Sequence, residues 1–291
     1  MTRNIVWEML RFLPLVESYL SIFENLYYVY IMKTIRDFGN QFSIHGDLGE
    51  DYWCSDEMFN DHFPREFDIG SAILGKTCLE VGAGSGRIIK MISKLKPKSL
   101  VAVEPSKSFR YLLKNTKNIP NVSYEKCAGD KFNATNLDTI FSIGVIHHIP
   151  YPGPVIAHIY DALKPGGMFI CWVYGKENQR VYVFFQNLTR KFTSITPDFL
   201  LNWFSYFLAI SLSIYCKLLD NFDYPMKNYF KSNFLKCGLK FRKYIVFDQL
   251  NPSYSKYYTR ENIESLLIDN KFKILHIYHR HSYSWTIIGL K

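Results

Sequence analysis

The sequence predicts an α/β protein built on a doubly wound parallel sheet that ends in an antiparallel strand pair. Three observations support this prediction. Short apolar runs alternate with helical patterns from Thr77 to Tyr174. A glycine-rich turn joins the first of these runs to the first helix. Near the C-terminus, a helical pattern and two more strand-like runs continue the same plan.

The parallel strands and the helices between them follow in order along the middle of the chain. Apolar runs of strand length that alternate with helical patterns indicate a doubly wound parallel sheet. The predicted strands are Thr77–Val81, Leu100–Glu104, Val122–Lys126, Thr139–Ile143 and Met168–Tyr174, and the predicted helices are Arg87–Leu95, Ser106–Asn115 and Pro154–Leu163.

The C-terminal part predicts one helix and two strands. Thr259 is a helix N-cap candidate, with Asn262 in the position where a capping box usually has Glu. Lys273–His279 and Trp285–Leu290 have the pattern of strands. We therefore divide the chain into a helical N-terminal extension or cap (1–70), a core (71–175), a helical insertion that forms a lid (176–256) and the C-terminal part of the core (257–291).

Composition and charge limit the class of protein. With 291 residues, of which 48% are hydrophobic, the chain is long enough for one large α/β domain with a sizeable core. Its formal charge of +9 comes from Lys and Arg that are scattered, with no run of five. This pattern favours a solvated basic surface, and we expect no nucleic-acid partner.

The cysteines and the N-terminus bear on the compartment. The six cysteines form no C-x-x-C motif, so we expect a reducing compartment and no structural zinc. Arg11, Glu17 and Glu24 interrupt the apolar N-terminal run, which predicts an amphipathic helix rather than a signal peptide. The expected location is the cytoplasm, with peripheral attachment to a membrane as the alternative.

The segment LEVGAGSGR, Leu79 to Arg87, carries the strongest functional signal. A strand, a glycine turn and a helix N-terminus bring the backbone close to a ligand. A dinucleotide fingerprint would place its third glycine at position 87, which is Arg87. The spacing here is G-x-G-x-G after Glu80, and Glu104 follows the second strand, where a carboxylate can accept ribose hydroxyls.

In these motifs the chain resembles the class I S-adenosylmethionine-dependent methyltransferases. The resemblance implies a Rossmann-like core, S-adenosyl-L-methionine as cofactor and no catalytic metal. The residues expected to bind the cofactor are Glu80, Gly82, Ala83, Gly84, Gly86, Glu104, Pro105, Asp130 and Ser142. For Asp130, which would accept the adenine amino group, a plain turn aspartate is the alternative.

The fourth predicted strand ends in SIGVIHHIP, Ser142 to Pro150. Active sites of doubly wound folds lie at the carboxyl ends of the strands, so His147 and His148 are the catalytic candidates. A histidine can act as a base near neutral pH. The alternative is that one of them only braces the loop by hydrogen bonding.

The segments YGKEN, FDQLNP and YYTREN resemble one bacterial and archaeal branch of this family, which has a long hydrophobic insertion. Tyr52 and Trp53 match an aromatic pair in its N-terminal extension. The resemblance implies an association with surface-glycan assembly. The N-P-P-Y motif of nucleic-acid amino methyltransferases does not follow the fourth strand.

Within the insertion, Phe199 to Cys216 contains no charged residue and reaches the length of a membrane span. Strands before and after it must join the same sheet, which argues against a single crossing. We expect a buried or lid helix pair, with a monotopic membrane contact or a dimer face as alternatives.

The sequence therefore predicts methyl transfer from S-adenosyl-L-methionine to an oxygen atom of a small molecule or glycan intermediate. The aromatic insertion keeps an apolar quinone or lipid as an alternative substrate. A cofactor-fold protein that binds without turnover is the alternative from another class. The acceptor itself and the oligomeric state are open.

Overall fold

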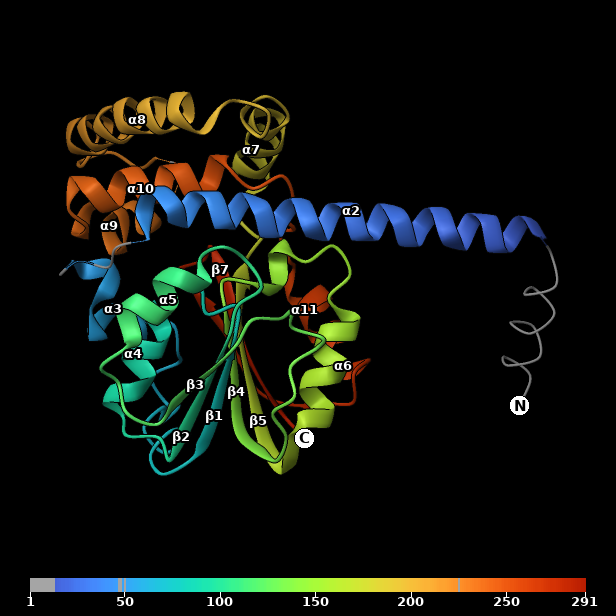
Figure 1. Cartoon of the computed structure of the whole chain (residues 1–291). Helices are drawn as coiled ribbons and strands as arrows, with labels where there is room; N and C mark the ends of the chain where they lie inside the picture. Colours follow the sequence, from blue (N-terminus) through green and yellow to red (C-terminus); the bar gives the residue numbers. More distant parts are fainter. Residues whose placement is uncertain (1–13, 47–48, 50, 225) are drawn as a thin grey trace.

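The computed structural model describes residues 14–46, 49, 51–224 and 226–291. Its centre is a seven-stranded sheet in the order β3-β2-β1-β4-β5-β7-β6 (Figure 1). The first five strands run parallel, and β7 is antiparallel to both β5 and β6. The predicted α/β fold with a terminal antiparallel pair is thus confirmed. The strands are β1 (Thr77–Val81), β2 (Ser99–Val103), β3 (Val122–Glu125), β4 (Leu137–Ile143), β5 (Leu163–Tyr174), β6 (Lys273–Arg280) and β7 (Ser284–Leu290).

Helices cover both faces of the sheet, as expected for parallel strands that are buried on both sides. On one face, α3 (Asp56–Asn60), α4 (Arg87–Lys94) and α5 (Phe109–Thr116) share a buried cluster with the sheet. On the other face, α6 (Gly153–Ala162) and α11 (Arg260–Ile268) do the same. Because both faces of the sheet are covered, a ligand-binding site has to lie at an edge of the sheet, and the carboxyl ends of the parallel strands form such an edge.

Most element boundaries lie within a few residues of the prediction, but β5 begins at Leu163 and not at Met168. The second predicted helix begins at Phe109 and not at Ser106, because the Ser106 N–H donates to the Glu104 carboxylate and holds a turn there. Thr259 caps α11 as expected, since its Oγ1 accepts from the Asn262 N–H at 3.3 Å.

A long helix, α2 (Pro14–His45), lies across the carboxyl end of the sheet and projects past α6 (Figure 1). Residues 1–13 of the predicted N-terminal helix lie outside the described residues. The short helix η1 (Tyr52–Cys54) connects α2 to α3. The N-terminal segment thereby reaches the same edge of the sheet as the glycine turn.

The segment between β5 and α11 forms α7 (Arg180–Thr193), α8 (Asp198–Leu218), α9 (Lys227–Ser232) and α10 (Leu239–Leu250), with η3 (Phe234–Lys236) before α10. These helices stack over the carboxyl end, with α7 and α8 outermost and α9 and α10 beneath them (Figure 1). The apolar stretch forms one helix, α8, which packs against α10. It is a surface helix and not a buried one, since only 28% of its most apolar stretch is buried.

Candidate active site

The glycine turn after β1 is held by its neighbours on two sides. The N–H groups of Gly82 and Ala83 both donate to the Val103 carbonyl, at 2.8 and 2.9 Å. Gly82 has φ +77°, and a Cβ there would lie 2.5 Å from Val145 Cγ2. At Gly84 a Cβ would lie 2.9 Å from the ring of Phe42 on α2. Glycine is therefore required here both by conformation and by space.

Two carboxyl groups, those of Glu104 and Glu80, lie at this turn and differ in their hydrogen bonding. Glu104 Oε2 accepts the Gly84 N–H at 2.9 Å, and Glu104 Oε1 accepts the Ser106 N–H at 2.8 Å. Glu80 is buried, and among the described residues its Oε2 has no hydrogen-bond partner. Burial raises the pKa of Glu80 well above its usual value. An unpartnered carboxylate oxygen at this place suits a ligand that donates hydrogen bonds or carries positive charge.

One large cavity of about 1240 Å³ begins at this turn and extends under the insertion. Most of the predicted cofactor residues lie on its wall: Glu80, Gly82, Ala83, Gly84, Glu104, Pro105 and Asp130. Gly86 and Ser142 are not on the wall, because Gly86 is the N-cap of α4 and the Ser142 side chain is buried within the sheet.

The two candidate histidines occupy different places. His148, in η2 (Ile146–His148), lies on the cavity wall, and its Nδ1 is 3.0 Å from the Tyr254 carbonyl. A carbonyl only accepts, so Nδ1 carries the proton and Nε2 is left as an acceptor. Burial lowers the pKa of His148 to about 3, so the ring is neutral at physiological pH.

His147 lies behind this wall. Its ring is fully buried, with its centroid 3.9 Å from that of Tyr174, and it does not line the cavity. Neither ring nitrogen has a hydrogen-bond partner among the described residues. Burial lowers the pKa of His147 well below its usual value. The geometry therefore favours His148 over His147 for contact with a ligand in the cavity.

Asp248 and Gln249 of the segment FDQLNP belong to a group of hydrogen-bonded side chains that we call the lid cluster, which also contains Gln41, Tyr174 and Tyr182. Asp248 accepts from Gln41 Nε2 at 2.6 Å and from the Tyr174 hydroxyl at 3.0 Å. Gln249 Nε2 donates to the Tyr174 hydroxyl at 2.8 Å, and its Oε1 accepts from Tyr182 at 3.0 Å. Burial raises the pKa of Asp248 above its usual value. Four members of the cluster, Tyr174, Tyr182, Asp248 and Gln249, place polar groups on the cavity wall.

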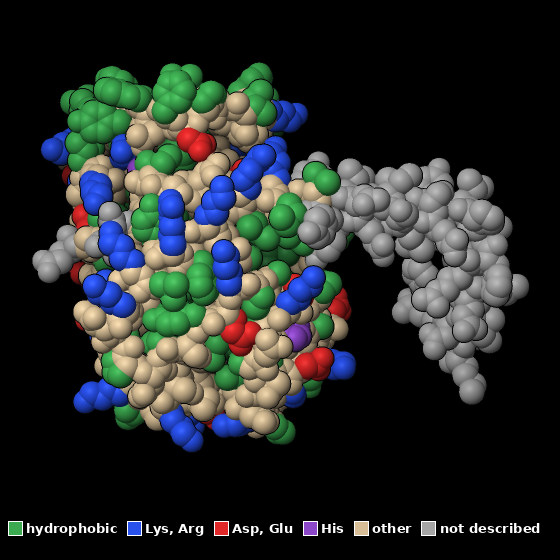
Figure 2. All heavy atoms as spheres, viewed as in Figure 1, with side chains coloured by type: hydrophobic (Ala, Val, Ile, Leu, Met, Phe, Trp, Pro, Cys, Tyr) green, Lys and Arg blue, Asp and Glu red, His purple; other side chains and the backbone are tan. Residues whose placement is uncertain are grey.

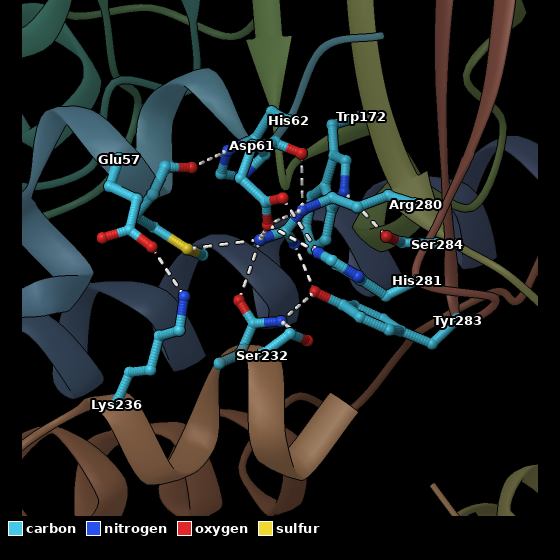
Figure 3. A network of polar contacts seen from close by, with 12 residues as sticks. Glu57, Asp61, His62, Trp172, Ser232, Lys236, Arg280, His281, Tyr283 and Ser284 are labelled. Atoms are coloured by element: carbon cyan, nitrogen blue, oxygen red, sulfur yellow. Dashed lines mark hydrogen bonds and ion pairs between the residues drawn. The ribbon is translucent and has the colours of Figure 1, made fainter. Parts of the chain in front are cut away.

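A second network joins three distant segments around Arg280, which is 1% exposed (Figure 3). Arg280 Nη2 donates to Asp61 Oδ2 at 2.6 Å and to Asn233 Oδ1 at 2.8 Å. Its Nη1 donates to the Tyr283 hydroxyl. These contacts tie the end of α3, the loop after α9 and the β6–β7 hairpin together at the far end of the cavity.

Sequence reasoning missed several residues of the site. The segment FDQLNP was noted for its resemblance, yet nothing in it marked Asp248 as a cavity residue. Phe38 and Phe42 share one face of α2 at a spacing of four and line the cavity, a signal present in the sequence. Arg280 carried no local signal, because its partner Asp61 is 219 positions away.

Comparison with known proteins agrees with this geometry. A family model described as "Methyltransferase domain" matches residues 79–169, the part from the glycine turn to β5. The chain is 28% identical over 99 residues to a tRNA U34 carboxymethyltransferase of Nautilia profundicola, covering 33% of each chain. It is 27% identical over 133 residues to that of Pseudoalteromonas atlantica, covering 44% of this chain and 40% of the relative. The chain thus spans well under half the length of these relatives.

Solved structures share the fold. The structure of the pyocyanin biosynthetic protein PhzM aligns with a TM-score of 0.50 at 14% identity, covering 79% of this chain and 53% of that one. A SAM-dependent methyltransferase from Aquifex aeolicus aligns with a TM-score of 0.46 at 13% identity, covering 76% and 85%. At 14% identity, the similarity to PhzM supports a shared fold and nothing further.

Proposed function

We propose that this chain, whose core is a class I S-adenosylmethionine-dependent methyltransferase domain, transfers a methyl group from that cofactor to an oxygen atom of a small molecule held in the cavity. The observation that carries the proposal is the single cavity of about 1240 Å³. The glycine turn and its carboxylates line one part of it, and side chains of α2 and of the insertion line much of the rest.

The residues of the first part of the cavity wall fit the cofactor. Glu80 offers a buried carboxylate oxygen that has no hydrogen-bond partner in the described part of the chain, which suits the amino group of the methionine part. Glu104 has lone pairs left on both oxygens after accepting one N–H on each, which suits the ribose hydroxyls. Gly82, Gly84 and Asp130 complete the proposed set. When bound, the cofactor supplies an electrophilic methyl group on a sulfonium.

His148 is the proposed catalytic residue. Its Nε2 can accept a hydrogen bond from an acceptor hydroxyl and orient the oxygen for an in-line displacement. Burial lowers the pKa of His148 to about 3, so it is a weak base. A weak base is sufficient when the hydroxyl proton becomes acidic only as the carbon–oxygen bond forms. The apolar side chains of the cavity wall limit the access of bulk water to the reacting atoms.

The rest of the cavity wall favours an acceptor with a substantial apolar part. Phe38, Phe230, Phe234 and Ile245 line it, beside polar side chains that include Asp248, Gln249 and Arg280. Such a wall supports a quinone, a lipid or a glycan carried on an apolar group over a free sugar, because burying hydroxyls without partners is unfavourable.

A tRNA acceptor follows from the names of the relatives alone. The match to those proteins covers a third to two fifths of their length. We therefore do not propose a nucleic acid as the methyl acceptor, and the experiment below includes a tRNA fraction to test it.

The test uses the full chain and a cofactor with a labelled methyl group. Calorimetry should show binding of S-adenosylmethionine, and the chain should then label a compound in a small-molecule or lipid extract. The same incubation with His148→Asn serves as the matched control for turnover. Binding without transfer to any fraction would make the chain a cofactor-fold binding protein. Transfer only to a tRNA fraction would replace the small-molecule acceptor.

A further inference from the structure

Helix α8 turns its bulky apolar side chains to the outside of the molecule. The residues that pack inward follow one another at intervals of about four and are mostly small: Leu201, Ser205, Ala209, Ser213 and Cys216, all buried. Aromatic residues between them, such as Trp203 and Phe207, are 63% and 59% exposed. This arrangement is the reverse of a helix that serves the core of a soluble domain.

Helix α7 extends the same surface. Phe184 and Phe192 are 65% and 66% exposed, and Ile195, in the turn to α8, is 76% exposed. Figure 2 shows hydrophobic side chains gathered over α7 and α8, with Lys and Arg side chains below them. We call the surface formed by Phe184, Phe192, Phe199, Trp203, Phe207 and Leu218 the outer apolar face. A contiguous face of this kind marks an interaction site rather than ordinary surface.

We propose that the outer apolar face docks on the surface of an anionic lipid bilayer, with α7 and α8 lying in the headgroup region. Aromatic residues such as Trp203 and Tyr215 suit this region, where an apolar ring meets a polar layer. The docking does not depend on which molecule accepts the methyl group.

Docking in the plane accounts for the position of α8 better than a crossing does. By length and composition α8 could span a membrane. It packs along α10, however, and Arg242 Nη1 donates to Ser213 Oγ on its inner side at 3.0 Å. The chain before and after it returns to the same sheet. A crossing would remove these contacts from the fold, whereas docking in the plane keeps them.

Charges at the border of the face favour lipid over a second copy of the chain. Arg180 and Lys191 stand on α7, and Lys217 stands in the last turn of α8, all exposed. A two-fold pair of copies would bring the positive charge of both borders to one interface. Anionic headgroups would instead neutralise them.

The outer apolar face is also continuous with the cavity. Val181 and Phe185 are 71% and 59% exposed, and both line the cavity. A bilayer under this face would therefore border the cavity wall, and a lipid-soluble molecule could enter without crossing water. No such continuity would be needed for a contact between copies.

The test is co-sedimentation with vesicles of equal parts phosphatidylcholine and phosphatidylglycerol. The unchanged chain should bind these vesicles, and should bind phosphatidylcholine alone, or the mixture at high salt, more weakly. The double variant Trp203→Ser/Phe207→Ser should lose about tenfold or more in partitioning, because binding scales with the apolar area inserted. Leu74→Ser is the control, since Leu74 is 63% exposed but precedes β1 at the opposite end of the sheet.

Thermal melting and S-adenosylmethionine binding should be unchanged in the variants. If the first double variant does not fold, Phe192→Ser/Ile195→Ser should give the same loss of vesicle binding. Equal binding by the variants and the unchanged chain would overturn the proposal. A second result would also overturn it: the unchanged chain does not bind vesicles and sediments as a dimer, and Trp203→Ser/Phe207→Ser sediments as a monomer. The outer apolar face would then join two copies of the chain.

Discussion

At the scale of single residues, Glu104 shows how a carboxylate can order the turn beside it. Its two oxygens accept the N–H groups of Gly84 and Ser106, so it fixes the backbone on both sides of the expected cofactor position. Glu80, one strand away, has one oxygen without a hydrogen-bond partner among the described residues. Glu104 therefore orders the turn with one hydrogen bond on each oxygen, whereas an oxygen of Glu80 stays free to accept a hydrogen bond from a ligand.

We expect Glu104→Ala to weaken binding of S-adenosylmethionine by about 1–3 kcal/mol, because buried N–H donors lose their acceptor. Calorimetry measures this directly. Glu125→Ala is the matched control, since Glu125 ends the neighbouring strand β3 and accepts from the exposed Asn133 N–H. If Glu104→Ala binds S-adenosylmethionine as tightly as the control does, Glu104 is not a cofactor-binding residue.

The two histidines differ in a way that mutation can separate. His148→Asn should lower turnover about a hundredfold while leaving cofactor affinity in place, because only the ring on the cavity wall can accept the proton. His147→Phe should keep turnover and melt at no lower a temperature, because it removes two buried ring nitrogens to which no described residue donates or accepts a hydrogen bond. Equal loss of turnover in both variants would contradict the distinction.

At the scale of elements, the lid and the core are joined by polar contacts as well as apolar packing. Arg280 at the end of β6 contacts the end of α3 and the loop after α9 (Figure 3). The buried guanidinium is compensated only while all of these elements are in place. The network therefore fixes how the insertion sits over the sheet.

Asp61→Asn should destabilise the fold by about 3 kcal/mol, because it leaves the buried Arg280 charge without its carboxylate. Urea unfolding followed by circular dichroism measures the change. Asp56→Asn is the matched control, because it breaks an ion pair whose Lys94 and Asp56 side chains are 54% and 63% exposed. It should lower the free energy of unfolding by less than about 1 kcal/mol. A loss at Asp61 no larger than at Asp56 would show that the network does not bear on stability.

At the scale of the whole molecule, buried neutral histidines make stability depend on pH. Burial lowers the pKa of His148 to about 3 and that of His45 to about 4, and lowers the pKa values of His62 and His147 well below their usual value. In the unfolded chain these rings take up protons as the pH falls through about 6.5. Since the unfolded state then binds more protons, stability present above pH 6.5 is lost as the pH falls.

Between pH 7 and pH 5, the unchanged chain should therefore lose about 1–2 kcal/mol more than His148→Asn does. Urea unfolding at the two pH values gives the difference. Comparison with the variant is needed because burial raises the pKa of Glu80 and Asp248, whose protonation acts in the opposite direction. A pH dependence that is the same in both proteins would mean that His148 is not buried neutral.

Much of the fold was predictable because its signals are local. Strand β1 has the predicted bounds, Thr77–Val81, since an apolar run that ends in a glycine turn allows few other conformations. The positions of Glu104 and Asp130 on the cavity wall also follow, because the carboxyl ends of parallel strands meet at one edge. His147 and His148 could not be told apart, since neighbouring residues of a short helix point in different directions that the sequence does not specify.

The sequence by itself determined the sheet, the glycine turn, the cofactor class and the presence of an uncharged helix in the insertion, all of which depend on residues close together in the chain. Only the tertiary structure decided that α8 packs its small residues inward on α10 and leaves Trp203 and Phe207 outside. It also decided that Arg280 and Asp61 meet across 219 positions. A helix that is apolar on all sides has no preferred face until a partner is present, and a buried ion pair forms only where the packed elements bring its members together.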